Sequence, residues 1–245
     1  MADISAQVPR KAVLLVGGKG TRLRPLTDDI PKALLNVNGK TVIEHIFDLF
    51  LKYGVSEVIL CVGHLKEKIM DYVGDGSSFG LKVVYVKEEQ PLGTAGPLLL
   101  AKQHLRNVEN SFIVSNGDEL KDIDIAKMYQ LHKKENSSAT LALTKVDDPS
   151  HYGVAKINYS RIIDFVEKPK REEAPSNLIN AGFYMIKPEV LDLIEPGFSM
   201  LEKDVFPKLA HSGKLYGFPF TGQWFDIGSI ERYEKAKKMW KGIKK

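Results

Sequence analysis

The most constraining feature of this sequence is a regular alternation of two hydrophobic patterns. Through about two-thirds of the chain, short apolar runs of strand length are separated by segments whose apolar residues recur with helical spacing. This alternation is typical of βαβ units arranged around a parallel sheet. The predicted strands in this part are 12–16, 57–62, 82–86, 112–115 and 139–145, and the predicted helices are 42–53, 66–73, 95–104 and 125–135.

From Val154 onward the elements become shorter and resemble hairpins. The strands predicted here are 154–157, 162–167, 178–186, 215–219 and 224–227, and the helices are 188–194, 200–211 and 230–240. The sequence therefore predicts an α/β fold: a Rossmann-like, mostly parallel but mixed sheet flanked by helices, with a small antiparallel addition in the C-terminal half. It shows no repeat or long linker, so we expect a single domain, 1–245, with a soft division near residue 150.

The net charge of +4 is carried by the end of the chain. Residues 231–245 hold seven Lys or Arg and two Glu, so their net charge is +5 and the remainder sums to −1. A basic last helix is usually a solvated face that also suits the helix dipole. We therefore expect no nucleic-acid partner, although a basic-tailed nucleic-acid-binding protein is one alternative.

Other features favour a cytoplasmic protein with no membrane partner. No apolar run approaches the roughly 20 residues of a membrane helix, and Met1–Arg10 lacks the features of a signal peptide. The one cysteine, Cys61, lies in an apolar run and is expected to be buried. No histidines form a metal-spaced pair, so we expect surface or capping roles for His45, His64, His104, His132, His151 and His211.

A glycine-rich loop directly follows the first predicted strand. Three glycines in four positions, Gly17, Gly18 and Gly20, let the backbone approach a ligand and direct its N–H groups toward a phosphate. Arg22, Arg24 and Lys32 add three cations nearby. Taken alone, such a loop is equally compatible with a tight structural turn. It matches neither the G-x-G-x-x-G dinucleotide fingerprint nor the Walker A loop.

Two aspartates follow predicted strands and are candidates for a metal site. Asp118 comes directly after strand 112–115 and Asp226 lies at the end of another short strand. Mg²⁺ prefers oxygen ligands and is commonly held by one or two carboxylates together with substrate phosphates. Since Asn-Gly-Asp is also a common turn composition, Asp118 alone leaves the turn interpretation open.

The full stretch Gly17–Lys32 reads G-G-x-G-T-R-L-R-P-L-T-x-x-x-P-K and resembles the signature of the sugar-1-phosphate nucleotidylyltransferases. The resemblance continues, in the family's order, through the motifs at 89–97, 116–118, 152–154, 165–169, 180–182 and 224–228. The motifs at 92–97, 202–207 and 223–228 look most like mannose-1-phosphate guanylyltransferases, also called GDP-mannose pyrophosphorylases. Many of those enzymes continue into a left-handed β-helix domain, which we do not expect in this chain.

The resemblance implies a glycosyltransferase-A-like fold and an Mg²⁺-dependent transfer of a nucleotidyl group to a sugar 1-phosphate. It implies a nucleotide-binding half at about 11–150 and a sugar-phosphate-binding half at about 151–245. The implied catalytic residues are Arg22, Lys32, Asp118, Lys168 and Asp226, of which Asp118 and Asp226 hold Mg²⁺. The implied nucleotide ligands are Gly17, Gly18, Gly20, Thr21, Arg22, Lys32, Leu92, Gly93, Thr94, Asn116 and Gly117. The implied sugar-phosphate ligands are Gly153, Glu167, Lys168 and Asn180.

Several questions stay open at this stage. The preferred substrates are expected to be GTP and mannose 1-phosphate, with glucose-1-phosphate thymidylyl- or uridylyltransferase and heptose-1-phosphate guanylyltransferase as alternatives. A nucleotide-sugar-binding regulatory subunit without catalysis is an alternative of another class. The sequence does not decide between a monomer and a homodimer.

Overall fold

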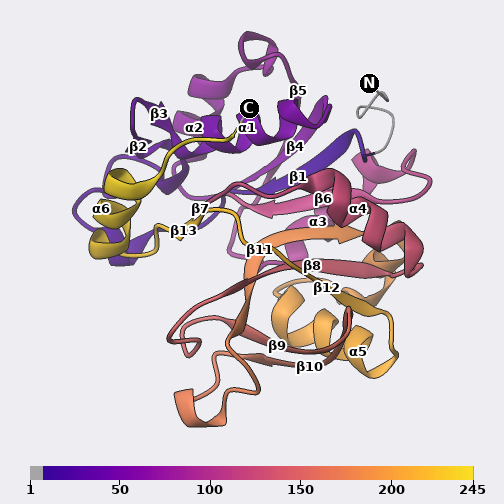
Figure 1. The fold of residues 1–245 in the computed structure, drawn as a ribbon. Coiled ribbons are helices and arrows are strands. Elements are labelled where there is room, and N and C mark those ends of the chain that lie inside the picture. The colour runs from indigo at the N-terminus through magenta and orange to yellow at the C-terminus, as the bar shows by residue number, and fades with distance from the viewer. Residues whose placement is uncertain (1–7, 245) are drawn as a thin grey trace. The chain divides into compact units, whose positions relative to one another are not determined.

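The computed structural model describes residues 8–244, which form two compact units. Each unit is built from segments that are separated in the sequence. The first unit contains 8–91, 115–123 and 222–244, and the second contains 92–114 and 124–221. In Figure 1 the yellow C-terminal segment accordingly belongs with the indigo N-terminal strands. Residues 1–7 of the Met1–Arg10 segment, and Lys245, lie outside the described part. Within that part, no helix has both the length and the apolar character needed to cross a membrane.

The first unit is built on a parallel sheet. Its central strand β4 pairs in parallel with β1 on one side and β5 on the other. Two short antiparallel pairs, β2 with β3 and β7 with β13, complete its strands. The bounds are β1 Lys11–Leu15, β2 Asn36–Val37, β3 Lys40–Thr41, β4 Glu57–Val62, β5 Lys82–Lys87, β7 Glu119–Lys121, β13 Trp224–Asp226, α1 Val42–Lys52, α2 Lys66–Val73 and α6 Ile230–Met239.

The sequence determines where helix α1 begins and which face it buries in this unit. Thr41 and Glu44 form a capping box, in which the Thr41 hydroxyl accepts from the Glu44 N–H and the Glu44 carboxylate accepts from the Thr41 N–H. The helix buries a broad apolar face and contacts both β7 and the 3₁₀ turn Lys32–Leu34. It therefore supports two segments that carry candidate site residues.

The second unit holds a mixed, mainly antiparallel arrangement. Its strands lie in the order β11, β8, β12, β10, β9, and only the β12–β8 pair is parallel. Strand β6 (Phe112–Asn116) begins in this unit and ends in the first. The other bounds are β8 Ala139–Lys145, β9 Gly153–Asn158, β10 Arg161–Glu167, β11 Leu178–Ile186, β12 Leu215–Pro219, α3 Gly96–Ala101, α4 Ile125–Lys134 and α5 Phe206–His211. The predicted α/β class with an antiparallel C-terminal part is confirmed.

Three predicted helices differ from the observed ones. The helix at 95–104 ends at Ala101 and continues as a 3₁₀ turn, and residues 188–193 form 3₁₀ turns only. The helix at 200–211 is divided into a π-helical turn, Leu201–Val205, and α5. Pro207 explains the division, because it lacks the N–H that would continue the helical ladder but suits the first turn of a new helix. Strand β7 is missing from the prediction because three residues are too few to show a period.

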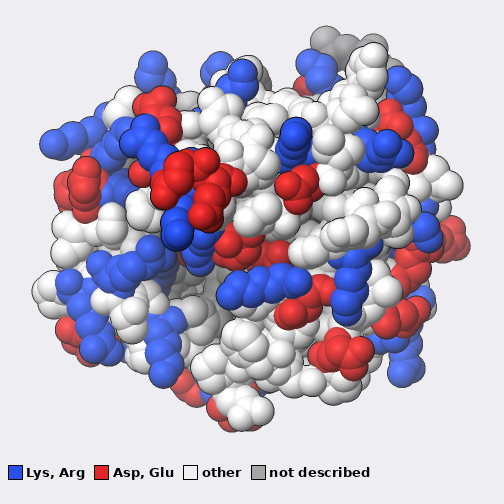
Figure 2. Space-filling view, turned by 90° about the horizontal axis from the view of Figure 1, so that it is seen from below, with Lys and Arg blue, Asp and Glu red and all other residues white. Residues whose placement is uncertain are grey.

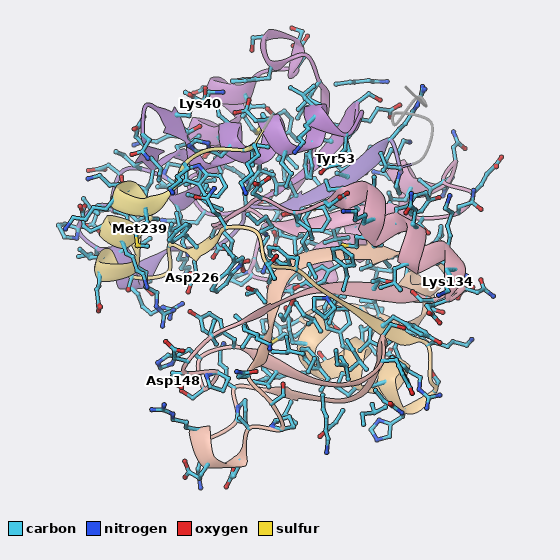
Figure 3. All side chains as sticks on the ribbon, in the orientation of Figure 1. Lys40, Tyr53, Lys134, Asp148, Asp226 and Met239 are labelled. Atoms are coloured by element: carbon cyan, nitrogen blue, oxygen red, sulfur yellow. The ribbon has the colours of Figure 1, made fainter. Side chains whose placement is uncertain are left out.

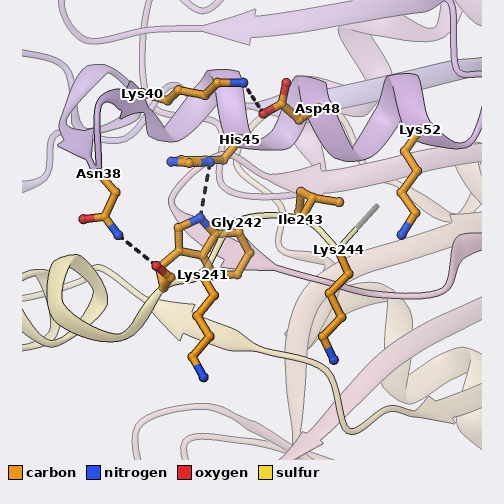
Figure 4. A pocket seen from close by; sticks show the side chains of 10 residues that line it. Asn38, Lys40, His45, Asp48, Lys52, Lys241, Gly242, Ile243 and Lys244 are labelled. Carbon is orange, nitrogen blue, oxygen red and sulfur yellow. Dashed lines mark hydrogen bonds and ion pairs between the residues drawn. The ribbon is translucent and has the colours of Figure 1, made fainter.

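The C-terminal segment lies along α1 (Figure 4). The Trp240 indole donates to Nδ1 of His45 at 3.2 Å, and the His45 Nε2–H donates to the Val37 carbonyl at 2.8 Å. The Asn38 side chain donates to the Trp240 carbonyl at 2.8 Å. A pocket of about 620 Å³ lies between this segment and α1, and four of its ten lining residues are lysines. The contacts fix the end of the chain to the first unit.

The prediction of surface or capping roles is wrong for two histidines. His45 is 6% exposed and His132 is 1% exposed. The His132 ring contacts the hydroxyls of Ser111 and Thr140 at 2.8 and 2.9 Å. Burial, with a smaller contribution from the charge of Lys187, lowers the pKa of His132 to about 4. Cys61 is buried as predicted, and burial raises the pKa of its thiol.

We predict that His132 makes folding stability depend on pH. The folded pKa is below the unfolded value, so the unfolded chain binds more protons at acidic pH and stability falls as the pH drops. Between pH 7 and pH 5 this residue should remove about 2 kcal/mol of unfolding free energy. Urea unfolding of His132→Gln should show a shallower pH dependence than the wild type, whereas the exposed-site control His151→Gln should match the wild type. Identical slopes for His132→Gln and the wild type would contradict the prediction.

Candidate active site

The glycine loop after β1 divides into packed and open positions. A Cβ built on Gly17 would lie 2.4 Å from Oε1 of Glu88, and one on Gly63 would lie 2.9 Å from the Gly17 carbonyl. A Cβ built on Gly18 would meet nothing within 4 Å. Gly63 is therefore needed for its close approach to the Gly17 backbone, while the backbone at Gly18 is accessible to a ligand.

The loop then turns through a left-handed residue. Gly20 has a φ of 63°, and its carbonyl accepts from the Thr27 hydroxyl at 2.8 Å. Thr21 opens a short 3₁₀ turn that presents the exposed side chain of Arg22. The Arg22 guanidinium lies 3.3 Å from the position that a Cβ on Gly228 would occupy. The loop cation therefore reaches the turn that follows β13.

Lys32 and Asp118 form an ion pair although 86 residues separate them. The Nζ–Oδ2 distance is 2.7 Å, and the Lys32 side chain is 12% exposed. Burial disfavours the ionised form of Asp118, but the charge and hydrogen bond of Lys32 and the charge of Lys121 together outweigh this effect and hold the pKa of the carboxyl below its usual value. Asp118 is therefore a carboxylate at neutral pH.

The turn before Asp118 packs against β1. The Gly117 N–H donates to the Leu15 carbonyl at 2.9 Å. A Cβ on Gly117 would lie 2.3 Å from Cγ1 of Val16 and 2.9 Å from that carbonyl. The neighbouring Asn116 donates to Oε1 of Glu119 at 3.2 Å. This close approach to β1 sets the position of Asp118.

Pairing of β7 with β13 brings together the two candidate metal ligands, Asp118 just before β7 and Asp226 at the end of β13. Asp226 lies opposite Glu119 in the antiparallel register, and the Ile227 N–H donates to the Asp118 carbonyl at 3.3 Å. Figure 3 shows Asp226 where β13 leads toward α6. Its carboxylate accepts from the Gly228 N–H at 2.6 Å and from Nη1 of Arg232 at 2.5 Å.

The sequence analysis missed a buried cluster beside these aspartates. The Glu119 carboxylate accepts from the Trp224 indole at 2.9 Å and lies 3.4 Å from Nζ of Lys121, whose side chain is 1% exposed. Burial raises the pKa of Glu119 and lowers that of Lys121, so each ion depends on the other. Their spacing of two, just after Asp118, was the signal available in the sequence. Arg232 was also missed, and its position three residues after the helix cap Ser229 gave no comparable signal.

The donor chemistry of Asp118 and Asp226 fits a hard divalent cation. Both side chains offer carboxylate oxygens, and Mg²⁺ accepts one or two such ligands while phosphates and water complete its shell. Among residues 8–244, no group of three or more His, Cys, Asp or Glu side chains is arranged to hold a metal ion. A cation at this site would therefore need further ligands from a bound substrate.

Charges of both signs are mixed on the face shown in Figure 2, where Lys and Arg lie among Asp and Glu. The same holds at the site itself, where Lys32, Lys121 and Arg232 each pair with an acid. The local pairs therefore determine the electrostatics of the candidate site.

In the second unit, the Leu92-Gly93-Thr94 loop is docked on residues 199–202. The Ser199 N–H donates to the Leu92 carbonyl at 3.0 Å. Gly93 has a φ of +79°, and a Cβ there would lie 2.3 Å from the Ser199 carbonyl. The Thr94 hydroxyl accepts from the Leu201 N–H at 2.9 Å. The left-handed backbone and the close approach explain why glycine occupies position 93.

The candidate sugar-side residues gather in the second unit. Gly153 pairs with Glu167 across β9 and β10, and a Cβ on Gly153 would lie 2.9 Å from Oε2 of Glu167. Lys168 has a left-handed φ of 48°, and its ammonium lies 3.2 Å from the Glu167 carboxylate with 61% of the side chain exposed. Asn180 lies on β11, next to the Ile179–Val154 pair, and is 9% exposed.

Comparisons with known proteins show the family of this chain. The model of the nucleotidyl transferase family matches residues 11–241, and the chain belongs to that family. It is similar to the mannose-1-phosphate guanylyltransferase 1 of Arabidopsis thaliana, with 40% identity over 91% of this chain and 62% of the relative. It is also similar to the mannose-1-phosphate guanyltransferase of Yarrowia lipolytica, with 41% identity over 89% of this chain and 60% of the relative.

A solved UDP-glucose pyrophosphorylase in complex with UDP-glucose superposes with a TM-score of 0.82 and 25% identity, covering 94% of this chain and 97% of that one. The chain spans about 60% of the length of the two curated relatives.

We predict that alanine substitution destabilises the protein at one glycine of this site and not at another. Gly117→Ala should destabilise the protein by about 1–3 kcal/mol, because the new methyl group meets Val16 and the Leu15 backbone. Gly18→Ala should remain within about 0.5 kcal/mol of the wild type, because its methyl group enters open space. Urea denaturation of both variants measures the difference. Equal stabilities for the two variants would refute the packing described at Gly117.

Proposed function

We propose that this chain transfers a nucleotidyl group from a nucleoside triphosphate to a sugar 1-phosphate, forming a nucleotide sugar and pyrophosphate. The observation that carries the proposal is the β7–β13 pairing, which brings Asp118, just before β7, and Asp226, at the end of β13, together in the unit that also holds the glycine loop. Membership of the nucleotidyl transferase family supports the same reaction class.

In the proposed reaction, a phosphate oxygen of the sugar 1-phosphate attacks the α-phosphorus of the nucleotide, and the bond to the departing pyrophosphate breaks. The attacking group needs no general base, because the second pKa of a phosphate monoester is about 6. The main barrier is the approach of two polyanions, so positioning and charge neutralisation dominate catalysis. Cations, backbone N–H groups and paired carboxylates are suited to that task.

We assign roles in the first unit accordingly. The backbone at Gly17, Gly18, Gly20 and Thr21 would bind the triphosphate, and Arg22 and Lys32 would neutralise its β- and γ-phosphates. Asn116 and Gly117 would border the nucleotide. Asp118 and Asp226 would hold a divalent cation, for which we propose Mg²⁺. When bound, the cation would neutralise charge on the α-phosphate. A bound cation would share the two carboxylates with their present partners, Lys32 and Arg232.

Residues of the second unit would recognise the sugar 1-phosphate and the base. Lys168 would orient the incoming phosphate, while Glu167, Asn180 and the backbone at Gly153 would bind sugar hydroxyls. The Leu92-Gly93-Thr94 loop would contact the base and ribose. We propose GTP and mannose 1-phosphate as the preferred pair, because two relatives with about 40% identity are named for that specificity. A cytoplasmic location and a homodimer remain proposals from the sequence.

Asp118→Asn tests the metal role. The substitution keeps the shape of the side chain but removes the charge, so turnover should fall below detection while the thermal unfolding midpoint changes little. Pyrophosphate release under saturating Mg²⁺ measures the first effect and circular dichroism the second. Asp164→Asn, at an exposed position on β10, is the matched control and should retain wild-type turnover. Near-normal turnover of Asp118→Asn would rule out the metal role.

Substrate choice is tested by measuring pyrophosphate release for GTP, dTTP, UTP, CTP and ATP, each paired with mannose, glucose, galactose and heptose 1-phosphates. We expect the largest kcat/KM for GTP with mannose 1-phosphate. A preference for dTTP or UTP with glucose 1-phosphate would overturn that pair but keep the reaction class. Binding of a nucleotide sugar without release from any pair would instead support a regulatory subunit.

A further inference from the structure

A hydrogen-bond chain in the second unit contains two buried residues, Tyr184 and Glu202, that have no role in the mechanism above. It begins at Thr94, whose hydroxyl donates to Oε2 of Glu202 at 2.5 Å. The Tyr184 hydroxyl donates to Oε1 of the same carboxylate at 3.4 Å, and the Asn180 amide donates to the Tyr184 hydroxyl at 2.8 Å. Four side chains thus connect the Leu92–Thr94 loop to strand β11.

The chain is enclosed by the protein. Tyr184 is fully buried, Glu202 is 7% exposed and Asn180 is 9% exposed. Burial raises the pKa of Glu202, and the hydrogen bonds from Thr94 and Tyr184 oppose that effect. A buried acid is costly unless its hydrogen bonds are satisfied. Glu202 therefore holds both hydroxyl donors to one geometry.

The backbone around Glu202 is also specialised. Glu202 belongs to the π-helical turn Leu201–Val205, a conformation often found at functional sites. The residue that follows this turn, Phe206, packs edge-on against the ring of Tyr184 with centroids 5.2 Å apart. The Leu201 N–H donates to the Thr94 hydroxyl, which leaves that hydroxyl's proton for the Glu202 carboxylate. Backbone and ring contacts thus determine the direction of each bond.

The other end of the chain fixes an amide. The Asn180 side chain donates to Tyr184 through Nδ2 and accepts from the Gly182 N–H through Oδ1 at 3.0 Å. The pairing of β11 with β8 is irregular between Asn180 and Tyr184, which lets both side chains contribute to one chain of bonds. The amide orientation of Asn180 therefore depends on the Tyr184 hydroxyl.

We propose that Glu202 is a positioning residue that holds the Thr94 loop and, through Tyr184, the Asn180 amide, so that one buried carboxylate orders both the nucleotide loop and a sugar-hydroxyl ligand. This inference rests on the proposed function for its two substrates. It assigns Glu202 and Tyr184 no contact with either substrate. Their effect is to hold the Thr94 loop and the Asn180 side chain in place, so that less ordering of these groups is needed when each substrate binds.

Steady-state kinetics with GTP and mannose 1-phosphate test the proposal through the two KM values. Thr94→Val should raise KM for GTP alone, and Tyr184→Phe should raise KM for mannose 1-phosphate alone. Glu202→Ala should raise both, each by about tenfold. Glu202→Gln retains one carbonyl acceptor, so its two KM values should lie between those of Glu202→Ala and the wild type. It also provides a folded variant if Glu202→Ala is unstable. Thr94→Ser keeps the hydroxyl and should therefore have the wild-type KM for GTP.

The matched control is Ser138→Ala, which removes another hydroxyl-to-carboxylate bond of the second unit, from Ser138 to Glu189 at 2.6 Å. It should leave both KM values unchanged. The proposal is overturned if Tyr184→Phe and the Glu202 variants change the KM values no more than Ser138→Ala does. It is also overturned if Tyr184→Phe raises both KM values as Glu202→Ala does, because Glu202 would then not be the group that connects the two binding elements.

A substrate-free measurement separates this proposal from the proposed function. Amide hydrogen exchange at 92–96 and 180–184 should be faster in Glu202→Ala or Glu202→Gln than in the wild type, whereas Tyr184→Phe should accelerate only 180–184. If the wild type releases no pyrophosphate from any pair, the proposed function fails while this result still decides the positioning role. Unchanged exchange in both segments refutes that role.

Discussion

The pairing of two short strands, β7 and β13, is the constraint on which the candidate metal site depends. It joins segments more than a hundred residues apart in the sequence and brings Asp226 opposite Glu119 and close to Asp118. Three acids in so small a region repel one another. Lys32, Lys121 and Arg232 compensate them, so the region is stable as a set of ion pairs.

This charge balance has a functional consequence. The two carboxylates proposed to hold Mg²⁺ are each engaged by a cation in the substrate-free protein, and Asp226 also accepts from the Gly228 N–H. Lys32 helps to keep Asp118 ionised, and the two cations orient the carboxylates with which they pair. In the proposed function, a metal ion would share these carboxylates with Lys32, Arg232 and the Gly228 N–H.

In the second unit the buried acid Glu202 is held by neutral hydrogen-bond donors, whereas the acids of the candidate site in the first unit are paired with cations. Its binding loop is docked by backbone hydrogen bonds and by the left-handed Gly93, and its buried acid, Glu202, receives hydroxyl donors. Sugar hydroxyls and a base are recognised by oriented donors and acceptors, whereas phosphates are recognised by charge.

The sequence by itself determined the alternating α/β elements, the capped helix at Val42 and the motifs of the nucleotidyl transferase family, because these depend on local periodicity and spacing. Only the tertiary structure decided how β7 pairs with β13 and that His132 is buried. It also revealed that Glu202 connects Thr94 to Tyr184. Such contacts join residues far apart in the chain, and their energy comes from burial and charge pairing that no local pattern records.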